Sequence, residues 1–346
     1  PALELAAAGA ERPAPLVVAE YCAAAGELMR VSAQGSQLQA QTYLLAAFQT
    51  ASRAQLQGPA SLAAYRLGLV SLSGAPATGG TRGGGRRASR GPTDAVREVE
   101  QMRGDGPCEL LQRTTFVVNS SLPLSVASLG CAAEQARAAG DHRTAALAEL
   151  RLARLRLAVA ESNAEAGAEF RMEAADAARK GLPDAAKIED PALRAEGMGR
   201  LAAAILDAGG GPAADLAAVT AAMRAIPLPA AQAYAAALDA RLAAASGDTA
   251  TARRLLDEAL LLESQRSLPA RLPEYRLLYA EIDPAQREAH VLAAYDALEA
   301  IRPLLPRFDP ITEETAFALY MRRVFQGAVD VQLAGADGGV GMIRVK

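Results

Sequence analysis

The sequence predicts an all-α protein in which pairs of antiparallel helices stack into a solenoid. Hydrophobic residues make up 51% of the 346 residues but aromatic residues only 4%, so the apolar content is mostly Ala and Leu. These two residues have the best helix propensities, whereas the β-branched and aromatic residues that favour strands are scarce. Small apolar residues also recur at helical spacing on both sides of Gly-Asp pairs, which is typical of helical hairpins.

The clearest hairpin lies between Ala231 and Ser264. Gly247 and Asp248 interrupt an otherwise helical pattern there, and a pair of this kind makes a turn between two helices. Because small residues let helices approach closely, we expect Ala240 and Ala259 at the helix-helix contact. The residues that recur at helical spacing are Ala236, Ala240 and Ala243 before the turn, and Ala252, Leu256 and Ala259 after it.

A second hairpin starts near Val126 and turns at Gly140 and Asp141. The two Gly-Asp turns, whose glycines are at positions 140 and 247, lie 107 residues apart. This distance corresponds to roughly three units of about 34 residues with a few inserted residues, so two further hairpins should fill the interval. Candidate breaks inside it are Lys180–Pro183 and Gly209–Pro212.

This period and pattern resemble the tetratricopeptide repeat family, in particular its divergent, Ala-rich bacterial members. The resemblance covers about residues 122 to 302 and implies a TPR-like α-α hairpin solenoid. The sequence departs from the family because it has no Trp and no Pro at the position that closes the best hairpin. An unrelated array of helical hairpins is the alternative.

Four segments are expected along the chain. Residues 1–73 hold N-terminal helices that cap the array, and residues 74–92 are a flexible insertion, because this Gly- and Arg-rich stretch has no periodicity. Residues 93–333 form the repeat array, and residues 334–346 are an unstructured or truncated end. The helices expected in the cap are Pro15–Val31, Ser36–Leu56 and Ser61–Leu72.

Within the array, a short helix is expected from Thr93 to Met102. The run Thr114–Val118 has strand propensity, but no second strand could pair with it, so a buried helix segment is favoured. Near the C terminus we expect one helix over Pro284–Arg302 and another that begins at an N-cap on Thr312 and ends near Leu333.

The charge balance argues against several classes of partner. The chain has 36 basic and 39 acidic residues, so it has no broad basic field for nucleic acid. No run of about 18 apolar residues occurs, so no membrane span is expected. Cys22, Cys108 and Cys131 are too few and too far apart for a disulfide framework, which favours the reducing cytoplasm. A removed signal peptide is the alternative.

Residue types suited to catalysis or metal binding are scarce. The only histidines are His142, expected in an exposed loop, and His290, expected to pack or to face solvent on a helix. No C-x-x-C pair occurs, so we expect no metal and no cofactor. Cys131 is expected to be a buried thiol in a helix. The Gly79–Gly91 stretch lacks the G-K-[ST] ending of a phosphate loop. We assign no catalytic residue and expect no enzyme.

The segment Ala294–Leu333 resembles the last repeat of bacterial proteins in which a tetratricopeptide array precedes a CHAT domain, a caspase-like peptidase module. The resemblance rests on the helix Tyr295–Arg302, the turn Pro303–Pro306, Asp309-Pro310 and the helix through Arg323. It implies that this chain is the regulatory or sensor portion of such a protein. The alternatives are part of a peptidase whose catalytic domain is missing from this chain, and the sensor segment of a bacterial transcriptional regulator or cyclase.

A repeat scaffold of this kind is expected to bind a protein or peptide partner through the first helices of successive hairpins. These helices are predicted at Leu129–Ala139, Asp190–Ala208 and Pro229–Ala245. The charged residues expected at exposed positions on that surface, where ordinary solvated charges are the alternative, are Glu134, Arg137, Arg194, Glu196, Arg200 and Arg241.

Overall fold

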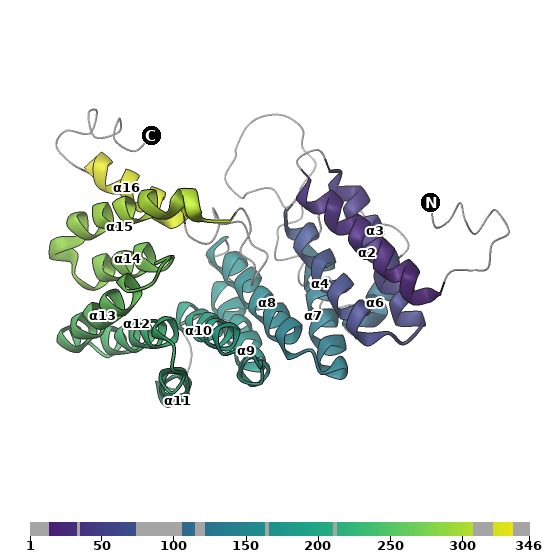
Figure 1. Cartoon of the computed structure of the whole chain (residues 1–346), viewed down its shortest axis with the longest axis horizontal. Helices are drawn as coiled ribbons and strands as arrows, with labels where there is room; N and C mark the ends of the chain where they lie inside the picture. The colour runs from purple at the N-terminus through teal and green to yellow at the C-terminus, as the bar shows by residue number, and fades with distance from the viewer. Residues whose placement is uncertain are drawn as a thin grey trace. The chain divides into compact units, whose positions relative to one another are not determined.

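The computed structural model describes residues 14–32, 35–73, 106–114, 122–162, 166–209, 213–306 and 321–334. All regular elements in these ranges are helices, so the predicted all-α class is confirmed for them (Figure 1). None of the described helices is long and apolar enough to cross a membrane. The chain divides into two compact units, one of residues 1–188 and 204–210 and one of residues 189–203 and 211–346.

In the first unit, most helices that follow one another in the chain also pack against one another. α2 packs on α3, α3 on α4, α4 on α7, α7 on α8 and α8 on α9, while the short helix α6 lies against α7 and α3 (Figure 1). This neighbour-to-neighbour packing is the kind expected of helical hairpins. The helices are α2 Pro15–Val31, α3 Gln37–Arg53, α4 Gln57–Ser73, α6 Pro107–Arg113, α7 Leu122–Ala139, α8 His142–Ser162 and α9 Gly167–Ala186.

The second unit has the same kind of sequential packing, from α11 through α16. It also contains residues 191–203 of α10, whose last residues belong to the first unit. The helices are α10 Pro191–Asp207, α11 Ala213–Arg224, α12 Pro229–Ala245, α13 Thr249–Ser264, α14 Leu272–Ile282, α15 Arg287–Ile301 and α16 Arg322–Ala334, with short 3-10 helices at Pro284–Gln286 and Arg302–Leu304.

Both predicted Gly-Asp turns are confirmed, and they have the same geometry. Gly140 and Gly247 have φ values of +72° and +84°, a left-handed conformation that Gly adopts without steric penalty. The amide of the following Asp donates to a carbonyl five residues earlier, at 2.8 Å in one turn and 2.9 Å in the other, which closes the preceding helix. The carboxylates of Asp141 and Asp248 each accept from the amide three residues later, at 3.0 Å, and so cap the next helix.

The α12–α13 hairpin has the contact that its spacing predicts. Ala240 and Ala259 are fully buried and belong to one apolar cluster, which also includes Leu256 and Tyr275. Because the facing side chains are mostly methyl groups, the two helix backbones can lie close together. Alanine spacing therefore predicted the contact face of this hairpin correctly.

Two predictions about the chain between the two Gly-Asp turns are wrong. Lys180–Pro183 does not break the chain but lies inside α9, and the break follows instead at Lys187. Pro183 is three residues from the helix end, so its missing amide removes only one backbone hydrogen bond of the last turn. The described residues between α8 and α12 form three helices, α9 to α11, where two hairpins would need four. The break at Gly209–Pro212 does separate α10 from α11.

The N-terminal helices lie close to their predicted positions. The helix Pro15–Val31 has the predicted bounds, while the next two differ by a few residues at their ends. The helix α14, Leu272–Ile282, lies inside the predicted array, but its bounds were not predicted. Several predictions concern residues outside the described ones: the insertion at 74–92, the helix Thr93–Met102, most of the run Thr114–Val118, the N-cap at Thr312 and the end at 335–346.

Candidate functional site

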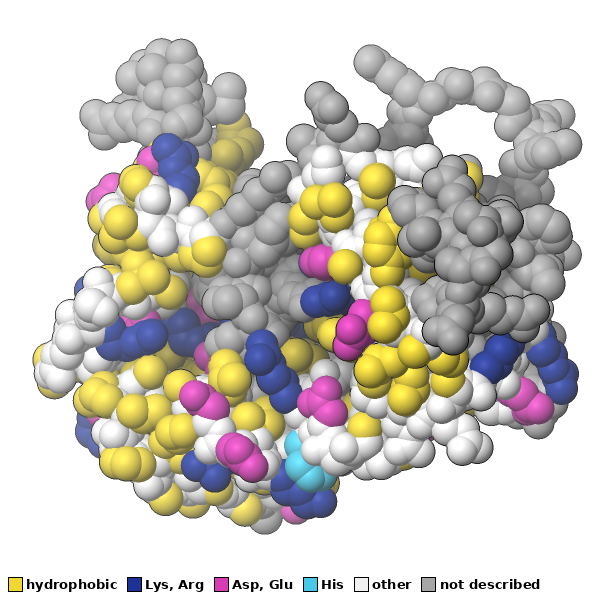
Figure 2. Space-filling view, turned by 45° about the vertical axis from the view of Figure 1, so that its right-hand side comes forward, with side chains coloured by type: hydrophobic (Ala, Val, Ile, Leu, Met, Phe, Trp, Pro, Cys, Tyr) yellow, Lys and Arg dark blue, Asp and Glu magenta, His cyan; other side chains and the backbone are white. Residues whose placement is uncertain are grey.

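The charged residues predicted to form a binding surface fall into two different environments. Glu134 and Arg137 are exposed, and Arg194 and Arg241 are partly accessible. Arg200, in contrast, is only 4% exposed, so its predicted exposure is wrong. Glu196 is also largely shielded from solvent by its ion pairs. The charged residues visible on one face of the molecule are of both signs and lie among hydrophobic side chains (Figure 2).

Glu196, Arg200 and Arg271 form a buried ion cluster in the second unit. Glu196 and Arg200 lie one turn apart on α10, and the Glu196 carboxylate accepts from Arg200 Nε. Its same oxygen, Oε1, accepts from Arg271 Nη2 at 2.5 Å. Arg271 immediately precedes α14, so this bond joins residues that are 75 positions apart in the sequence. The other terminal nitrogen of Arg271 donates to Glu274 at 2.7 Å. The cluster thus connects α10 to α14.

An aromatic ring from α12 completes this cluster. The Arg271 guanidinium carbon lies 3.7 Å from the centre of the Tyr234 ring, a cation-π arrangement. The ring also lies directly against Gly199 of α10, where an added Cβ would be 2.3 Å from Tyr234 Cε1. Only a residue without a side chain fits there without moving the ring. Three helices therefore meet at Arg271.

The pKa values in this cluster keep Glu196 and Arg271 charged and Tyr234 neutral over a wide pH range. Burial alone would raise the pKa of Glu196, but Arg200 and Arg271 outweigh it and hold that pKa at about 2. Burial raises the pKa of Tyr234 to about 12. For Arg271, burial opposes the charged form, yet Glu196 outweighs it and raises the pKa well above its ordinary value. These groups are therefore a stable ion network rather than a proton-transfer site at neutral pH.

A second buried carboxylate holds the segment that precedes α14. Glu263, at the end of α13, is completely buried. It accepts from the backbone amide of Arg271 at 3.0 Å and from Arg266 Nη1 at 2.8 Å. Burial raises the pKa of Glu263, although these hydrogen bonds oppose the shift. Glu263 therefore fixes the backbone from which the Arg271 side chain extends.

Arg137 is at the centre of a similar cluster in the first unit. Its Nε donates to Asp184 at 2.7 Å and its Nη2 donates to Glu149 at 2.9 Å, so it joins α7 to α8 and α9. His142 Nδ1 lies 3.2 Å from the other oxygen of Asp184. His142 is thus the first residue of α8 and part of this cluster, and it is partly buried, so the predicted exposed loop position is wrong. Burial raises the pKa of Glu149, while Arg137 opposes the shift.

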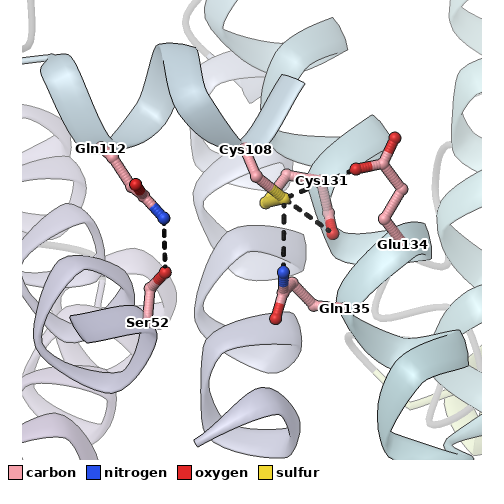
Figure 3. The surroundings of a disulfide bond; sticks show 6 residues. All are labelled: Ser52, Cys108, Gln112, Cys131, Glu134 and Gln135. Atoms are coloured by element: carbon pink, nitrogen blue, oxygen red, sulfur yellow. Dashed lines mark hydrogen bonds between the residues drawn. A yellow bond between two sulfur atoms is a disulfide. The ribbon is translucent and has the colours of Figure 1, made fainter. Parts of the chain in front are cut away.

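Glu134 lies beside a disulfide bond between Cys108 and Cys131 (Figure 3). The expectation that Cys131 is a thiol is wrong, and the bond joins α6 to α7. Glu134 Oε2 is 3.7 Å from Cys108 Sγ, and Gln135 Nε2 is 3.6 Å from it on another side. On the far side of α6, Gln112 Nε2 donates to Ser52 Oγ of α3 at 2.8 Å. The short helix is thereby fixed to two neighbours. Cys22 is a free thiol.

The remaining candidate residues have structural environments. His290 stacks on Tyr279 with ring centres 4.2 Å apart, which agrees with packing, one of its two predicted environments. Arg194 lies on α10 and Arg241 on α12, both half-buried. Among the residues that the structure describes, no group of three or more His, Cys, Asp or Glu side chains could hold a metal ion.

Sequence reasoning missed Arg271, Tyr234 and Glu263. Tyr234 is the one aromatic residue of the Ala-rich helix α12, which the structure describes from end to end, and this contrast was the available signal for it. Arg271 offers no local signal, because its partners come from distant parts of the chain.

Compared with known proteins, the sequence matches no protein-family model and has no significant match among curated proteins.

Proposed function

We propose that this chain is a non-catalytic helical-repeat scaffold that binds a protein or peptide partner. The observation that carries the proposal is the sequential packing of helices within each unit, since arrays of this kind present extended surfaces of neighbouring helices to partners. The ion clusters around Arg137 and Arg271 support this proposal, because they connect neighbouring helices and so keep such a surface rigid. A preformed surface loses little conformational entropy on binding.

Among the six predicted residues, Arg194 and Arg241 are our candidates for direct partner contact, because both side chains are partly accessible and both lie in the second unit. Glu196 and Arg200 are engaged in the buried cluster and act as positioning residues for the α10 surface. Arg137 is tied to two carboxylates, so its main role is to hold α7, α8 and α9 together. Charges at the edge of such a surface favour specificity and fast association over high affinity.

We further propose that the scaffold is the regulatory or sensor portion of a bacterial CHAT-type protein. The support is the resemblance of Ala294–Leu333 to the last repeat of such proteins. In this segment α15 ends at Ile301 and the 3-10 helix Arg302–Leu304 follows it, while Asp309-Pro310 and all but the end of the helix through Arg323 lie outside the described residues. The coding sequence that follows Lys346 tests this idea. An α/β domain with a His and a Cys there is expected, and a DNA-binding or cyclase domain would contradict it.

The disulfide changes the expected compartment. Disulfides persist in oxidising compartments and are rare in the cytoplasm, so Cys108–Cys131 favours an extracytoplasmic location over the cytoplasm predicted from cysteine usage. Cell fractionation with thiol alkylation before lysis tests this. Modification of only one of the three cysteines in the native protein supports both the disulfide and this location. Modification of all three cysteines contradicts both.

The binding function itself is tested by quantitative affinity capture from a lysate of the source organism. The wild-type chain is compared with a variant that carries Arg194→Glu and Arg241→Glu. We expect the wild type to enrich a small set of proteins and the variant to lose most of that enrichment, because the two substitutions reverse charges at the proposed contact.

The control carries Arg171→Glu and Arg287→Glu, which also reverse two arginine charges, at exposed positions on α9 and α15. It should retain the captured proteins. Equal capture by all three chains would show that Arg194 and Arg241 do not form the contact. No reproducible capture by the wild type, or hydrolysis of a peptide library by the purified chain, would contradict the proposed function.

A further inference from the structure

The outward face of α2 carries a row of exposed apolar side chains. Val17, Tyr21 and Leu28 are between 40% and 62% exposed, and Leu16 beside them is 41% exposed. With the exposed Ala24, the row follows spacings of four, three and four residues, which places its members in a line along one side of a helix. The opposite side of α2 packs on α3, where Gly26 lies against Leu44. The row therefore has no partner within the described residues.

Charges beside the row are few and mostly neutralised. Glu27 is held by Arg30 at 2.6 Å and lies 3.7 Å from Arg66. Glu20 is the one acidic residue on the exposed face of α2, a helix that the structure describes from end to end. Single exposed apolar residues are ordinary, but a continuous row of them on one helix is typical of an interaction surface.

We propose that this row is a self-association surface on which α2 of a second copy of the chain packs in the antiparallel direction. With a two-fold axis between positions 22 and 23, Val17 faces Leu28 of the second copy and Tyr21 faces Ala24 of the second copy. The large ring thus meets the smallest side chain of the row, twice by symmetry. A two-fold interface needs a surface that is complementary to itself in this way.

Charge favours this register over a parallel one. In the antiparallel pair, Glu20 faces Ala25 of the second copy, whereas a parallel pair would place the two Glu20 carboxylates opposite each other. Like charges at such positions are destabilising. The helix dipoles also oppose each other favourably in the antiparallel pair. The surface chemistry of α2 therefore suits a second copy of itself.

The size of the surface determines the expected strength. One helix against another buries less than the roughly 1,600 Å² of a standard interface, so we expect a weak dimer with a dissociation constant on the order of micromolar. Sedimentation velocity over a range of concentrations measures this directly. The wild type should pass from monomer to dimer as concentration rises, and a wild type that is monomeric at every concentration overturns the proposal.

Leu28→Glu should raise the dimer dissociation constant at least about tenfold, because two carboxylates then enter the apolar row. The side chain is 62% exposed, so the fold should be unaffected, which circular dichroism checks. Leu261→Glu on α13 is the matched control, since Leu261 is 61% exposed and lies in the other unit. An unchanged dissociation constant for Leu28→Glu, or an equal loss in the Leu261→Glu control, overturns the proposal.

The register is tested by mixing two variants, Val17→Lys and Leu28→Glu. Each alone should associate weakly. In the mixture, the ammonium group introduced by Val17→Lys in one chain faces the carboxylate introduced by Leu28→Glu in the other. Mixed dimers should therefore form more tightly than either variant with itself, and no gain on mixing overturns the antiparallel register. This result is independent of partner capture by Arg194 and Arg241, so the proposed function and the self-association can fail separately.

Discussion

Glu196 accepts hydrogen bonds from Arg271 and Arg200 with the same carboxylate oxygen, and it thereby joins α10 to the segment before α14. Two buried arginines thus share this one acidic side chain. We therefore expect Glu196→Ala to lower the free energy of unfolding by about 3 to 5 kcal/mol, because it removes the carboxylate that two buried cations share. Chemical denaturation followed by circular dichroism measures the loss.

Glu274→Ala is the control for that substitution. Glu274 also pairs with Arg271, but its side chain is well exposed. Removal of an exposed partner should cost about 1 kcal/mol or less. Equal losses for the two variants would show that the Glu196 pairs contribute no more than a surface ion pair.

The same carboxylate gives the stability a specific pH dependence. Its pKa is about 2 in the folded protein and 4.5 in the unfolded reference. A lowered pKa contributes stability that is fully present above pH 4.5 and is lost as the pH falls toward about 2. Glu196→Gln cannot titrate, so its stability should fall less over this range than that of the wild type. Parallel curves for the two proteins would contradict the assignment.

Gly199→Ala should destabilise the protein although Ala is the better helix former. The new Cβ would lie 2.3 Å from Tyr234 Cε1, so the ring and its contact with Arg271 must shift. We expect a loss of about 1 to 3 kcal/mol, the usual range for overpacking. Gly58→Ala is the matched control, because a Cβ there meets nothing within 4 Å. The control should be neutral or more stable than the wild type by up to about 1 kcal/mol.

Cys108→Ser should lower the free energy of unfolding by about 3 kcal/mol, as estimated from the entropy of a chain loop closed over 23 positions. Cys22→Ser, which removes the free thiol, should have little effect. Thermal unfolding with and without reductant gives the comparison. If the wild type unfolds at the same temperature in both conditions, the disulfide is absent or does not stabilise the fold.

Ala259→Arg should cost several kcal/mol, because a charged side chain cannot fit at the fully buried contact of α12 and α13. Leu261→Arg, two residues along the same helix and largely exposed, should change stability by less than about 0.5 kcal/mol. The thermal unfolding midpoints of the two variants show which of the two positions is buried. An unchanged midpoint for Ala259→Arg would mean that the register of this hairpin is wrong.

The sequence predicted local structure well where the determining residues are adjacent in the chain. Gly247 and Asp248 form their turn from their own backbone preferences, so its position was readable. Lys180–Pro183 was misread because a proline in a final turn removes too little bonding to end a helix that packs well. The burial of Glu196 and Arg200 was not readable, since it depends on Arg271, which is distant in sequence. The same holds for the pairing of Cys108 with Cys131.

That pairing changes the connectivity of the polypeptide as well as its stability. Cys108 and Cys131 are 23 positions apart, and the covalent ring they close includes Arg113, a residue type after which trypsin cuts. A protease that cuts within the ring cannot release either fragment, because the sulfur bridge still connects them. A chain cut there would migrate as one species in a denaturing gel without reductant and as two species after reduction. The N-terminal helices would thus remain attached to the rest of the protein after such a cut.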